Sequence, residues 1–327
     1  MRIIQRAAVV AMAVAVAGTV LSGSGPANAS ASASAAPSGG SLLAATDCLA
    51  PASTSARTTP EWRGRTDVPV TQADLDALPP ADARRSYVAR EIAPRLPARV
   101  DVPVYVHVIK GTHRGELSPA GPARVRRAIA ILNDGMAGKQ SSLSSPTRYR
   151  FVLKKIDYTK RDSWYHASFY GPRDKQVKRR LHRGGAGTLN LYLQGGPRDS
   201  AVLGWSRFPW QYASAPKLDG VSVNPASLLG GSATGYNRGD TVIHEVGHWL
   251  GLLHTFQGGC SASNDLVADT AAEGQPSYEC QTTRDTCTAP GLDPVRNFMD
   301  YSFDTCMTML TAGQTARIDA AFEKYRY

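Results

Sequence analysis

Apolar and polar residues alternate along several short segments of this chain, and each alternation predicts a β-strand. The clearest is Val100–Ile109, which reads V-D-V-P-V-Y-V-H-V-I. Thr188–Leu193, which reads T-L-N-L-Y-L, is nearly as regular. Further strands are expected at Tyr149–Ile156, Val202–Phe208 and Gly220–Val223.

Two segments between these strands have helical spacing instead. Pro119–Met136 carries an apolar stripe that consists of Val125, Ile129, Leu132 and Met136. Arg173–His182 is expected to be a basic helix. The order of strands and helices predicts an α/β (α+β) fold in which a twisted, mostly parallel sheet is backed by helices. A domain of about 230 residues can bury one core, or one core with two lobes.

The C-terminal part of the chain is expected to be less regular. A helix is predicted with Asp240 as its N-cap and Thr241–Leu250 as its body. Residues 257–295 are rich in Gly, Asp, Thr and Pro, which indicates a long loop that disulfides would have to hold. The last helix is expected to begin at Thr311, where Gln314 completes a capping box.

The first residues predict a secretory signal peptide over residues 1–29. Arg2 and Arg6 precede the small-residue apolar stretch Ala7–Leu21, and Ala27-Asn28-Ala29 fits the usual cleavage pattern. The apolar run is too short and too rich in alanine for a membrane span. We therefore expect a secreted, extracellular protein that is not held in a membrane.

Residues 30–95 are predicted to form a pro-segment that precedes a compact domain at 96–327. Its first part is rich in Ser, Ala, Gly and Pro and is expected to be disordered. One short helix is expected at Thr71–Leu78, with Thr71 as its cap. Several arginines are candidate processing points, and the sequence does not choose among them: Arg84, Arg85, Arg90, Arg95 and Arg99.

Charge is divided unevenly along the chain. Residues 100–239 carry 22 Lys and Arg against 8 Asp and Glu, whereas residues 240–327 carry 5 against 12. The basic residues are scattered with few aromatic residues between them, so we expect no nucleic-acid binding and interpret them mainly as a solvated basic face. The acidic half could favour basic substrates or hold calcium.

The most specific motif is H-E-V-G-H-W-L-G-L-L-H at 244–254. On a helix, His244 and His248 lie one turn apart on one face, so both can reach one metal ion. Glu245 points toward the same cavity and is suited to move protons. Gly251 allows the helix to end in a left-handed turn, after which His254 returns as a third ligand. Three protein ligands and an open position are typical of catalytic zinc, because structural zinc has four.

The five cysteines fall into two groups. Four lie near the C-terminus and indicate two disulfides in an oxidising compartment, with three pairings open: Cys260, Cys280, Cys287 and Cys306. The fifth, Cys48, stands alone in the segment expected to be removed. It is either a latency ligand that occupies the open zinc position in the precursor or an incidental exposed thiol.

Beside the histidine motif, N-F-M-D-Y at 297–301 resembles the Met-turn of metzincin metalloproteases. The chain most resembles the pappalysin family, which includes ulilysin. Four stretches carry this resemblance: H-E-V-G-H-W-L-G-L-L-H-T-F at 244–256, G-G-C at 258–260, V-A-D-T at 267–270 and N-F-M-D-Y-S-F-D-T-C-M at 297–307. It covers roughly residues 100–327 and implies a two-lobe metzincin-like catalytic domain with an active-site helix and an irregular, disulfide-bonded C-terminal lobe that ends in a helix.

The resemblance also implies roles for individual residues. His244, His248 and His254 become zinc ligands and Glu245 the general base. Met299 becomes the hydrophobic residue beneath the metal, and Tyr301 a phenol near it. The implied disulfides are Cys260–Cys287 and Cys280–Cys306.

Calcium and substrate sites follow from the same resemblance. Calcium is expected in the loop after the third histidine, where the candidate ligands are Asn264, Asp265, Asp269 and Thr270. An extended peptide substrate is expected to add to an edge strand formed by Val202, Leu203, Gly204, Trp205 and Ser206. Relatives of the ulilysin kind prefer Lys or Arg after the cut and use an acidic side chain past the Met-turn. Asp300 and Asp304 are acidic there, but Thr305 is not, so the chain departs from the pattern.

We therefore expect a monomeric, secreted zinc endopeptidase that is made as a latent precursor and acts on protein or peptide substrates. The alternative is a secreted zinc-containing protein that binds polyanions or a partner through its basic lobe. An amidase is the other enzymatic interpretation. An intact Glu245 favours an enzyme, because a structural zinc site needs no base.

Overall fold

The structure is a computed structural model that describes residues 66–67, 70, 72–88, 95–116, 118–198 and 200–327. These residues all belong to the unit Thr58–Tyr327. The predicted signal peptide, Cys48, Thr71 and Arg90 lie outside the described residues. Within the described part of the chain, no helix is both long enough and apolar enough to cross a bilayer.

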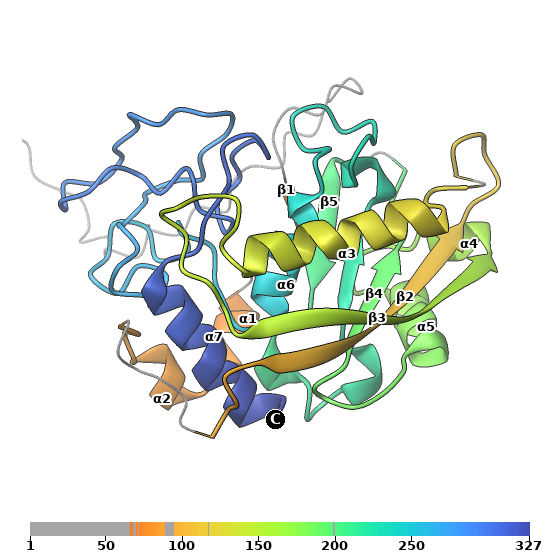
Figure 1. The fold of residues 1–327 in the computed structure, drawn as a ribbon, viewed down its shortest axis with the longest axis horizontal. Coiled ribbons are helices and arrows are strands. Elements are labelled where there is room, and N and C mark those ends of the chain that lie inside the picture. The colour runs from red at the N-terminus through yellow and green to blue at the C-terminus, as the bar shows by residue number, and fades with distance from the viewer. Residues whose placement is uncertain (1–65, 68–69, 71, 89–94, 117, 199) are drawn as a thin grey trace, which may run out of the picture. The chain divides into compact units, whose positions relative to one another are not determined.

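A mostly parallel, six-stranded sheet forms the centre of the domain (Figure 1). Its order is β1-β5-β6-β4-β2-β3, and every neighbouring pair is parallel except β5 and β6. The strands are β1 (Thr66–Asp67), β2 (Val100–Lys110), β3 (Tyr149–Lys160), β4 (Leu189–Leu193), β5 (Val202–Ser206) and β6 (Val221–Val223). All five strands predicted from the alternating pattern are present.

Helices cover both faces of this sheet. The helices are α1 (Gln72–Asp76), α2 (Pro80–Ala83), α3 (Pro122–Met136), α4 (Asp162–Tyr165), α5 (Pro172–Leu181), α6 (Asp240–Trp249) and α7 (Ala312–Tyr325). Side chains alternate across a strand, so Val106 and Leu191 face the core shared with α3 and α6. Ile109 and Tyr192 face a second core against α4 and α5. The predicted sheet backed by helices is confirmed.

The predicted starts of α3 and α6 are wrong. Helix α3, which was predicted over Pro119–Met136, begins at Pro122 and not at Pro119. Gly121 is extended, and Pro122 takes the first helical position. In α6, Asp240 is the first helical residue and Gly239 is the N-cap, without a side-chain cap of its own. The capping box at Thr311 and Gln314 is confirmed, with hydrogen bonds in both directions.

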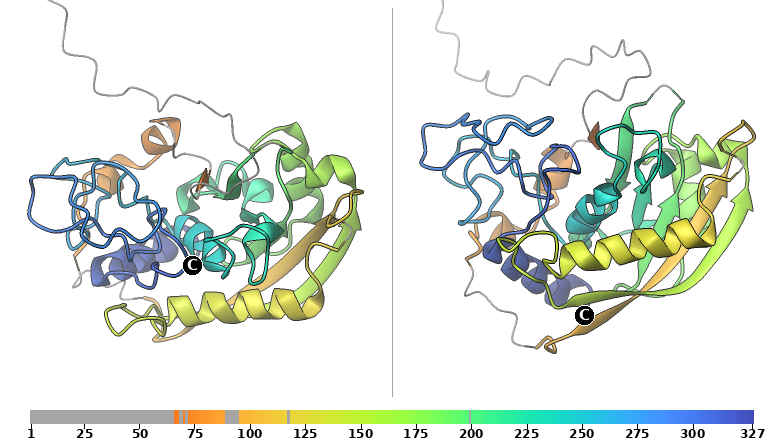
Figure 2. Two further views of the ribbon diagram at one scale, coloured as in Figure 1. Left: turned by 90° about the horizontal axis from the view of Figure 1, so that it is seen from above. Right: turned by 45° about the horizontal axis from the view of Figure 1, so that its top comes forward.

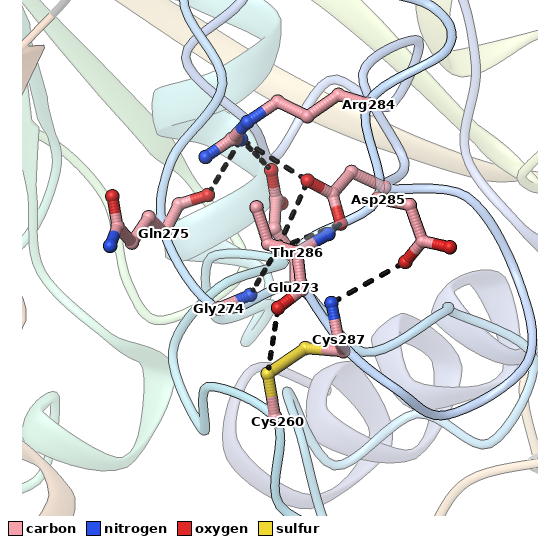
Figure 3. Close-up of a disulfide and its surroundings, with 9 residues drawn as sticks. Cys260, Glu273, Gly274, Gln275, Arg284, Asp285, Thr286 and Cys287 are labelled. Carbon is pink, nitrogen blue, oxygen red and sulfur yellow. Dashed lines mark hydrogen bonds and ion pairs between the residues drawn. A yellow bond between two sulfur atoms is a disulfide. The ribbon is translucent and has the colours of Figure 1, made fainter.

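The segment between α6 and α7 contains no helix or strand, as both views in Figure 2 show. Two disulfides hold it, Cys260–Cys287 and Cys280–Cys306, which is the pairing that the resemblance implied. Each closes a loop of 27 or 26 residues, so each is expected to contribute about 3 kcal/mol to stability. Near the first disulfide, Arg284 forms an ion pair with the buried carboxylate of Glu273 (Figure 3). It forms a second ion pair with the buried carboxylate of Asp293. The disulfides and ion pairs hold this segment in place, as hydrogen bonds between strands do in the sheet.

Candidate metal centre and active site

Three histidines converge beside α6. His244 and His248 lie one turn apart on this fully buried helix, and His254 arrives from the chain that follows it. The Nε2 atom of His248 lies 3.2 Å from Nε2 of His244 and 3.1 Å from Nε2 of His254. All three offer ligand atoms within 4.8 Å of one another. The three sequence-predicted ligands are therefore brought together.

Backbone carbonyl groups decide which nitrogen of two of these rings faces inward. His244 Nδ1 donates to the Phe298 carbonyl oxygen at 2.6 Å, and His248 Nδ1 donates to that of Leu252 at 2.8 Å. Because a carbonyl oxygen can only accept, each neutral ring carries its proton on Nδ1 and a lone pair on Nε2. Lone pairs this close repel one another unless a cation lies among them. The donor set therefore fits a metal ion, and three imidazoles suit zinc, whose nitrogen ligands bind at about 2.0–2.1 Å.

Gly251 lets the chain turn from α6 toward the third histidine. Its φ is 103°, in the left-handed region that favours glycine. A Cβ atom there would lie 2.9 Å from that of Ala321 in α7, so packing also excludes a side chain. The turn brings the Leu252 carbonyl oxygen back to His248. One glycine thus ends the helix, orients the second ligand and delivers the third.

Met299 lies directly against the metal-binding helix. A Cβ atom on Gly247 would overlap the Met299 Sδ atom, so this sulfur packs on the helix backbone between His244 and His248. The same turn supplies the Phe298 carbonyl group that holds His244. Its backbone is held in turn by Asn297, whose Oδ1 accepts from the Met299 amide at 3.0 Å. The turn therefore contributes both apolar packing and a hydrogen bond to the metal site.

Aromatic rings enclose the third histidine. Phe256 stacks on His254 with ring centroids 4.7 Å apart, and the Tyr301 ring lies 5.1 Å from His254 and 5.9 Å from His244. Tyr301 is only 6% exposed. Its ring therefore lies beside two of the three candidate ligands, as expected for a phenol near the metal.

Glu245 is fully buried between the two helical histidines and faces β5. A Cβ atom on Gly204 would lie 2.6 Å from Glu245 Cγ and would also overlap its Oε1 atom. The strand expected to bind substrate therefore contacts the candidate base directly. A carboxylate beside three metal-binding imidazoles is the arrangement used for metal-assisted hydrolysis.

Two further carboxylates, those of Glu273 and of Asp300 in the Met-turn, are buried in the C-terminal lobe. Burial, followed by repulsion from Asp300, raises the pKa of Glu273 to about 8, and burial raises the pKa of Asp300 to about 6. Glu273 accepts from the hydroxyl group of Thr255, which follows the third histidine, at 2.7 Å. Asp300 accepts from Ser277 N and from Ser302 Oγ, both at 3.0 Å. Asp300 is thus part of the packing of the C-terminal lobe.

Asp304, one of the two acidic residues past the Met-turn that were considered for substrate binding, caps a helix in the structure. Its Oδ2 atom accepts from the backbone amides of Arg238, Gly239 and Asp240 at 2.8, 3.1 and 3.4 Å. The side chain is 4% exposed. The carboxylate therefore caps the N-terminus of α6, where the amide groups and the helix dipole favour negative charge.

Asp304→Ala is expected to lower the free energy of unfolding by about 2 kcal/mol, because it removes a charged cap from a buried helix end. Asp304→Asn keeps one acceptor oxygen, so its free energy of unfolding should fall by less. Urea unfolding followed by circular dichroism measures both, and a peptide library measures cleavage preference. Unchanged stability together with a changed residue preference after the cut would restore the predicted role in substrate binding.

The four candidate calcium ligands lie in one loop, and all of them already have hydrogen-bond partners; Asp265 accepts from the Val267 amide at 3.1 Å. Both carboxylate oxygens of Asp269 serve α7, accepting from Thr311 Oγ1 at 2.7 Å and from Gly313 N at 2.8 Å. The side-chain amide of Asn264 donates to the Thr270 carbonyl oxygen at 2.6 Å. Asp265 is 1% exposed, and burial raises its pKa to about 8.

The expected edge strand β5 is paired on both sides. It is antiparallel to β6, and on its other side Thr66 and Asp67 of β1 run parallel to Val202 and Gly204. β5 would be an edge within 96–327, as predicted. In the whole chain, part of the expected pro-segment covers it.

Sequence reasoning missed the roles that four groups have in this site. The Phe298 and Leu252 carbonyl groups orient ligands through their backbone, so no side-chain pattern indicates them. Gly204 had a weak signal, since a glycine inside an apolar strand often marks a close approach of another group. The cap from Asp304 had no signal in the sequence, because it acts on amides more than sixty positions earlier.

Comparison with known proteins identifies the same chemistry. The family model described as pregnancy-associated plasma protein-A, of a peptidase family, matches residues 172–323. An extracellular metalloprotease of Neurospora crassa is 35% identical over 289 residues, which cover 87% of this chain and 96% of the relative. One from Verticillium alfalfae is 39% identical over 234 residues, 70% of this chain and 78% of the relative. These relatives favour a peptidase over a zinc-containing binding protein.

Solved structures agree on the fold. Mature mirolysin of Tannerella forsythia, in complex with a cleaved peptide, is 27% identical with a TM-score of 0.58 and covers 69% of this chain and 93% of its own. A promirolysin mutant, 24% identical with a TM-score of 0.60, covers 79% of this chain and 94% of its own. The histidine triad, the Met-turn and these similarities lead to one conclusion: the chain belongs to the pappalysin family of extracellular metalloproteases.

Proposed function

We propose that this protein is a zinc endopeptidase that is made as a latent precursor and uses Glu245 as its general base. The observation that carries the proposal is the convergence of three Nε2 atoms beside a buried carboxylate, with two of the rings oriented by carbonyl groups. His244, His248 and His254 would hold the zinc ion. When bound, zinc supplies a Lewis acid that polarises a peptide carbonyl group and makes water more acidic.

The chain's own groups would then carry the protons and orient the substrate. Glu245 would accept a proton from the attacking water and pass it to the nitrogen of the departing amine. The Tyr301 hydroxyl would donate a hydrogen bond to the oxygen on which negative charge develops. An extended peptide would pair with β5, through Val202, Leu203, Gly204 and Trp205, and would bring its carbonyl group beside Glu245.

The pro-segment contacts found along this chain support latency. β1 lies on the strand that a substrate would use, so both cannot pair there at once. Further along, Tyr87 forms a backbone bridge with Val267, in the loop after the third histidine. Asp82 accepts from Lys324 at 2.9 Å and from the Tyr325 hydroxyl at 2.7 Å, both on α7. The segment would therefore block the substrate strand while it is anchored elsewhere on the domain.

A boundary at Leu96 is consistent with the contacts around it. Leu96 is buried, and Arg148 donates to the carbonyl groups of Leu96 and Pro97 at 3.1 and 2.9 Å. Arg95 just before them is exposed. We propose residues 30–95 as the pro-segment, 96–327 as the catalytic domain and 1–29 as the signal peptide. The promirolysin structure covers more of this chain than mature mirolysin does, which is consistent with a shared precursor fold.

The full chain is expected to be far less active than the same chain cut before Leu96. Cys48→Ala should make the uncut chain measurably active if the thiolate occupies the open metal position in the precursor. Hydrolysis of a quenched fluorescent peptide, before and after limited proteolysis, tests both expectations. If the uncut Cys48→Ala chain is as inactive as the unaltered precursor, the thiol is not the source of latency. The contacts of β1, Tyr87 and Asp82 would then remain as its source.

We propose calcium in the loop at 264–270, with Asp265 as its strongest candidate ligand and Asn264, Asp269 and Thr270 around it. A fully buried carboxylate with a raised pKa is stabilised when a cation binds beside it. We also propose a preference for Lys or Arg after the cut, which now rests on the acidic charge of residues 240–327 alone, since Asp300 and Asp304 are engaged elsewhere.

One experiment tests activity and specificity together. Matured protein is incubated with a peptide mixture derived from a proteome, and the new termini are sequenced. We expect cleavage of internal peptide bonds, its loss with a zinc chelator and its return with added Zn²⁺. Cleavage that survives the chelator would exclude the zinc mechanism, and no enrichment of Lys or Arg after the cut would reject the specificity alone.

A further inference from the structure

A second group of metal-ligating side chains lies at the carboxyl ends of three neighbouring parallel strands. His113 and Glu116 follow β2, Asp162 and His166 follow β3, and Arg198 follows β4. The carboxyl ends of adjacent parallel strands meet at one edge of a sheet, where ligands commonly bind. Figure 1 shows α4, which begins at Asp162, at this end of β2 and β3 and away from α6. The peptidase mechanism uses none of these residues.

Two imidazoles face the same pair of carboxylates. His113, Glu116 and Asp162 each offer one ligand atom, and these atoms lie within 4.8 Å of one another. His166 Nε2 lies 3.0 Å from Glu116 Oε1 and 3.8 Å from Asp162 Oδ1. The two histidine rings are 6.4 Å apart, with the carboxylates near both.

The orientation of His166 points to a missing cation. Its Nδ1 atom donates to the Gly196 carbonyl oxygen at 3.2 Å, which leaves the lone pair of a neutral ring on Nε2. This Nε2 atom is buried, and the Glu116 and Asp162 oxygens that it faces cannot donate a hydrogen bond to it when they are ionised. A lone pair that faces two carboxylate oxygens is repelled by them, unless a metal ion or a proton lies between.

The surrounding hydrogen bonds hold both carboxylates in position. Glu116 Oε2 accepts from the His113 amide at 3.2 Å, so Oε1 is the oxygen that faces His166. Asp162 Oδ1 accepts from Thr112 Oγ1 and N at 2.9 and 3.1 Å. Mainly through the hydroxyl bond, Thr112 lowers the pKa of Asp162, which favours the ionised form that a metal needs. The site is therefore held by backbone as well as side chains.

The net charge of the group is negative, which favours the binding of a cation. Arg198 is the only permanently charged base in contact with the two carboxylates among the described residues, at 3.7 Å from Glu116 and 3.2 Å from Asp162. Its side chain is 46% exposed, so it can move aside. With neutral histidines the group keeps one net negative charge. Nitrogen and oxygen donors together suit zinc, whereas calcium and magnesium prefer oxygen alone.

We propose that His113, Glu116, Asp162 and His166 form a second zinc site, distinct from the histidine triad. Bound metal would tie the loops after β2 and β3 together and, through Gly196, would steady the chain between β4 and β5. The site would stabilise the fold and take no part in peptide hydrolysis.

Zinc stoichiometry tests the proposal. The full-length chain, without affinity-tag histidines, is stripped of metal, equilibrated with Zn²⁺ and assayed by equilibrium dialysis and elemental analysis. We expect about two zinc ions per chain, and about one in the double variant His113→Ala/His166→Ala and in His248→Ala. A wild-type ratio of one, or a double variant that still holds two, would overturn the second site. His248→Ala separates this result from a failure of the catalytic metal centre.

Two further variants distinguish loss of the metal site from misfolding. Glu116→Gln keeps the side-chain volume and an acceptor for the His113 amide, and should also lose one zinc ion. Asp134→Asn removes an exposed carboxylate that pairs with Lys139 and should lose none. Added Zn²⁺ should raise the melting temperature of His248→Ala but not that of His248→Ala/Glu116→Gln. If His166 is only a protonated partner of Glu116, neither the extra zinc ion nor this difference will be found.

Discussion

Glu245→Gln is expected to lower kcat/KM by at least about 100-fold while the protein keeps its zinc. Glutamine has nearly the same shape as glutamate, but it cannot take a proton from water at neutral pH. His244 and His248 are held by the Phe298 and Leu252 carbonyl groups, which the substitution leaves in place, so metal binding should be unaffected. Steady-state hydrolysis of a fluorescent peptide and elemental analysis of the same preparation measure both quantities.

The comparison with a ligand variant makes this result specific. His248→Ala should lose the catalytic zinc and the activity together, whereas Glu245→Gln should lose only the activity. Near-normal turnover in Glu245→Gln would remove Glu245 from its role as base. Loss of zinc in that variant would instead mean that the carboxylate helps to hold the metal.

Gly204→Ala is expected to lower kcat by about 100-fold, although it adds only a methyl group. The new Cβ atom would overlap the carboxylate of Glu245 and lie 2.6 Å from its Cγ atom, so the side chain must move. A catalytic group displaced by about 1 Å can lose this much rate. Steady-state kinetics with metal analysis checks the prediction, and we expect normal zinc content.

A matched glycine and a double variant control for general damage. A Cβ atom on Gly185 would meet nothing within 4 Å, so Gly185→Ala should leave kcat unchanged. In a Glu245→Gln background, Gly204→Ala should lower kcat only slightly further, because the effects of substitutions in groups that act as a unit are not additive. Full additivity would mean that Gly204 acts on substrate binding and not through Glu245.

The structure also explains why the catalytic helix depends on the irregular C-terminal lobe. That lobe supplies the cap from Asp304, the carbonyl group that holds His244 and the sulfur that packs on Gly247. Its own shape rests on two disulfides and on the buried pairs of Arg284. Reduction of the disulfides should therefore disturb the metal centre as well as the loop, because the two share these contacts.

The residues that were predicted well are those whose geometry depends on near neighbours. The alternating apolar positions of β2 and β4 predicted their strands, and Thr311 with Gln314 predicted the start of α7. The role that was predicted wrongly for Asp240 depends on a distant partner. Asp240 looked like a cap by local chemistry, but Asp304 had already taken that role from across the domain.

Local chain geometry was enough to indicate the candidate metal ligands, because a four-residue helical spacing and a glycine turn can bring three imidazoles together. It was also enough to indicate a strand at Val202–Ser206 and a disulfide-held loop after the third histidine. Long-range packing alone established that the Phe298 carbonyl group orients His244, that Gly204 lies against Glu245 and that Thr66–Asp67 covers β5. These contacts join residues far apart through backbone atoms or the absence of a side chain, and such features leave little trace in the order of amino acids.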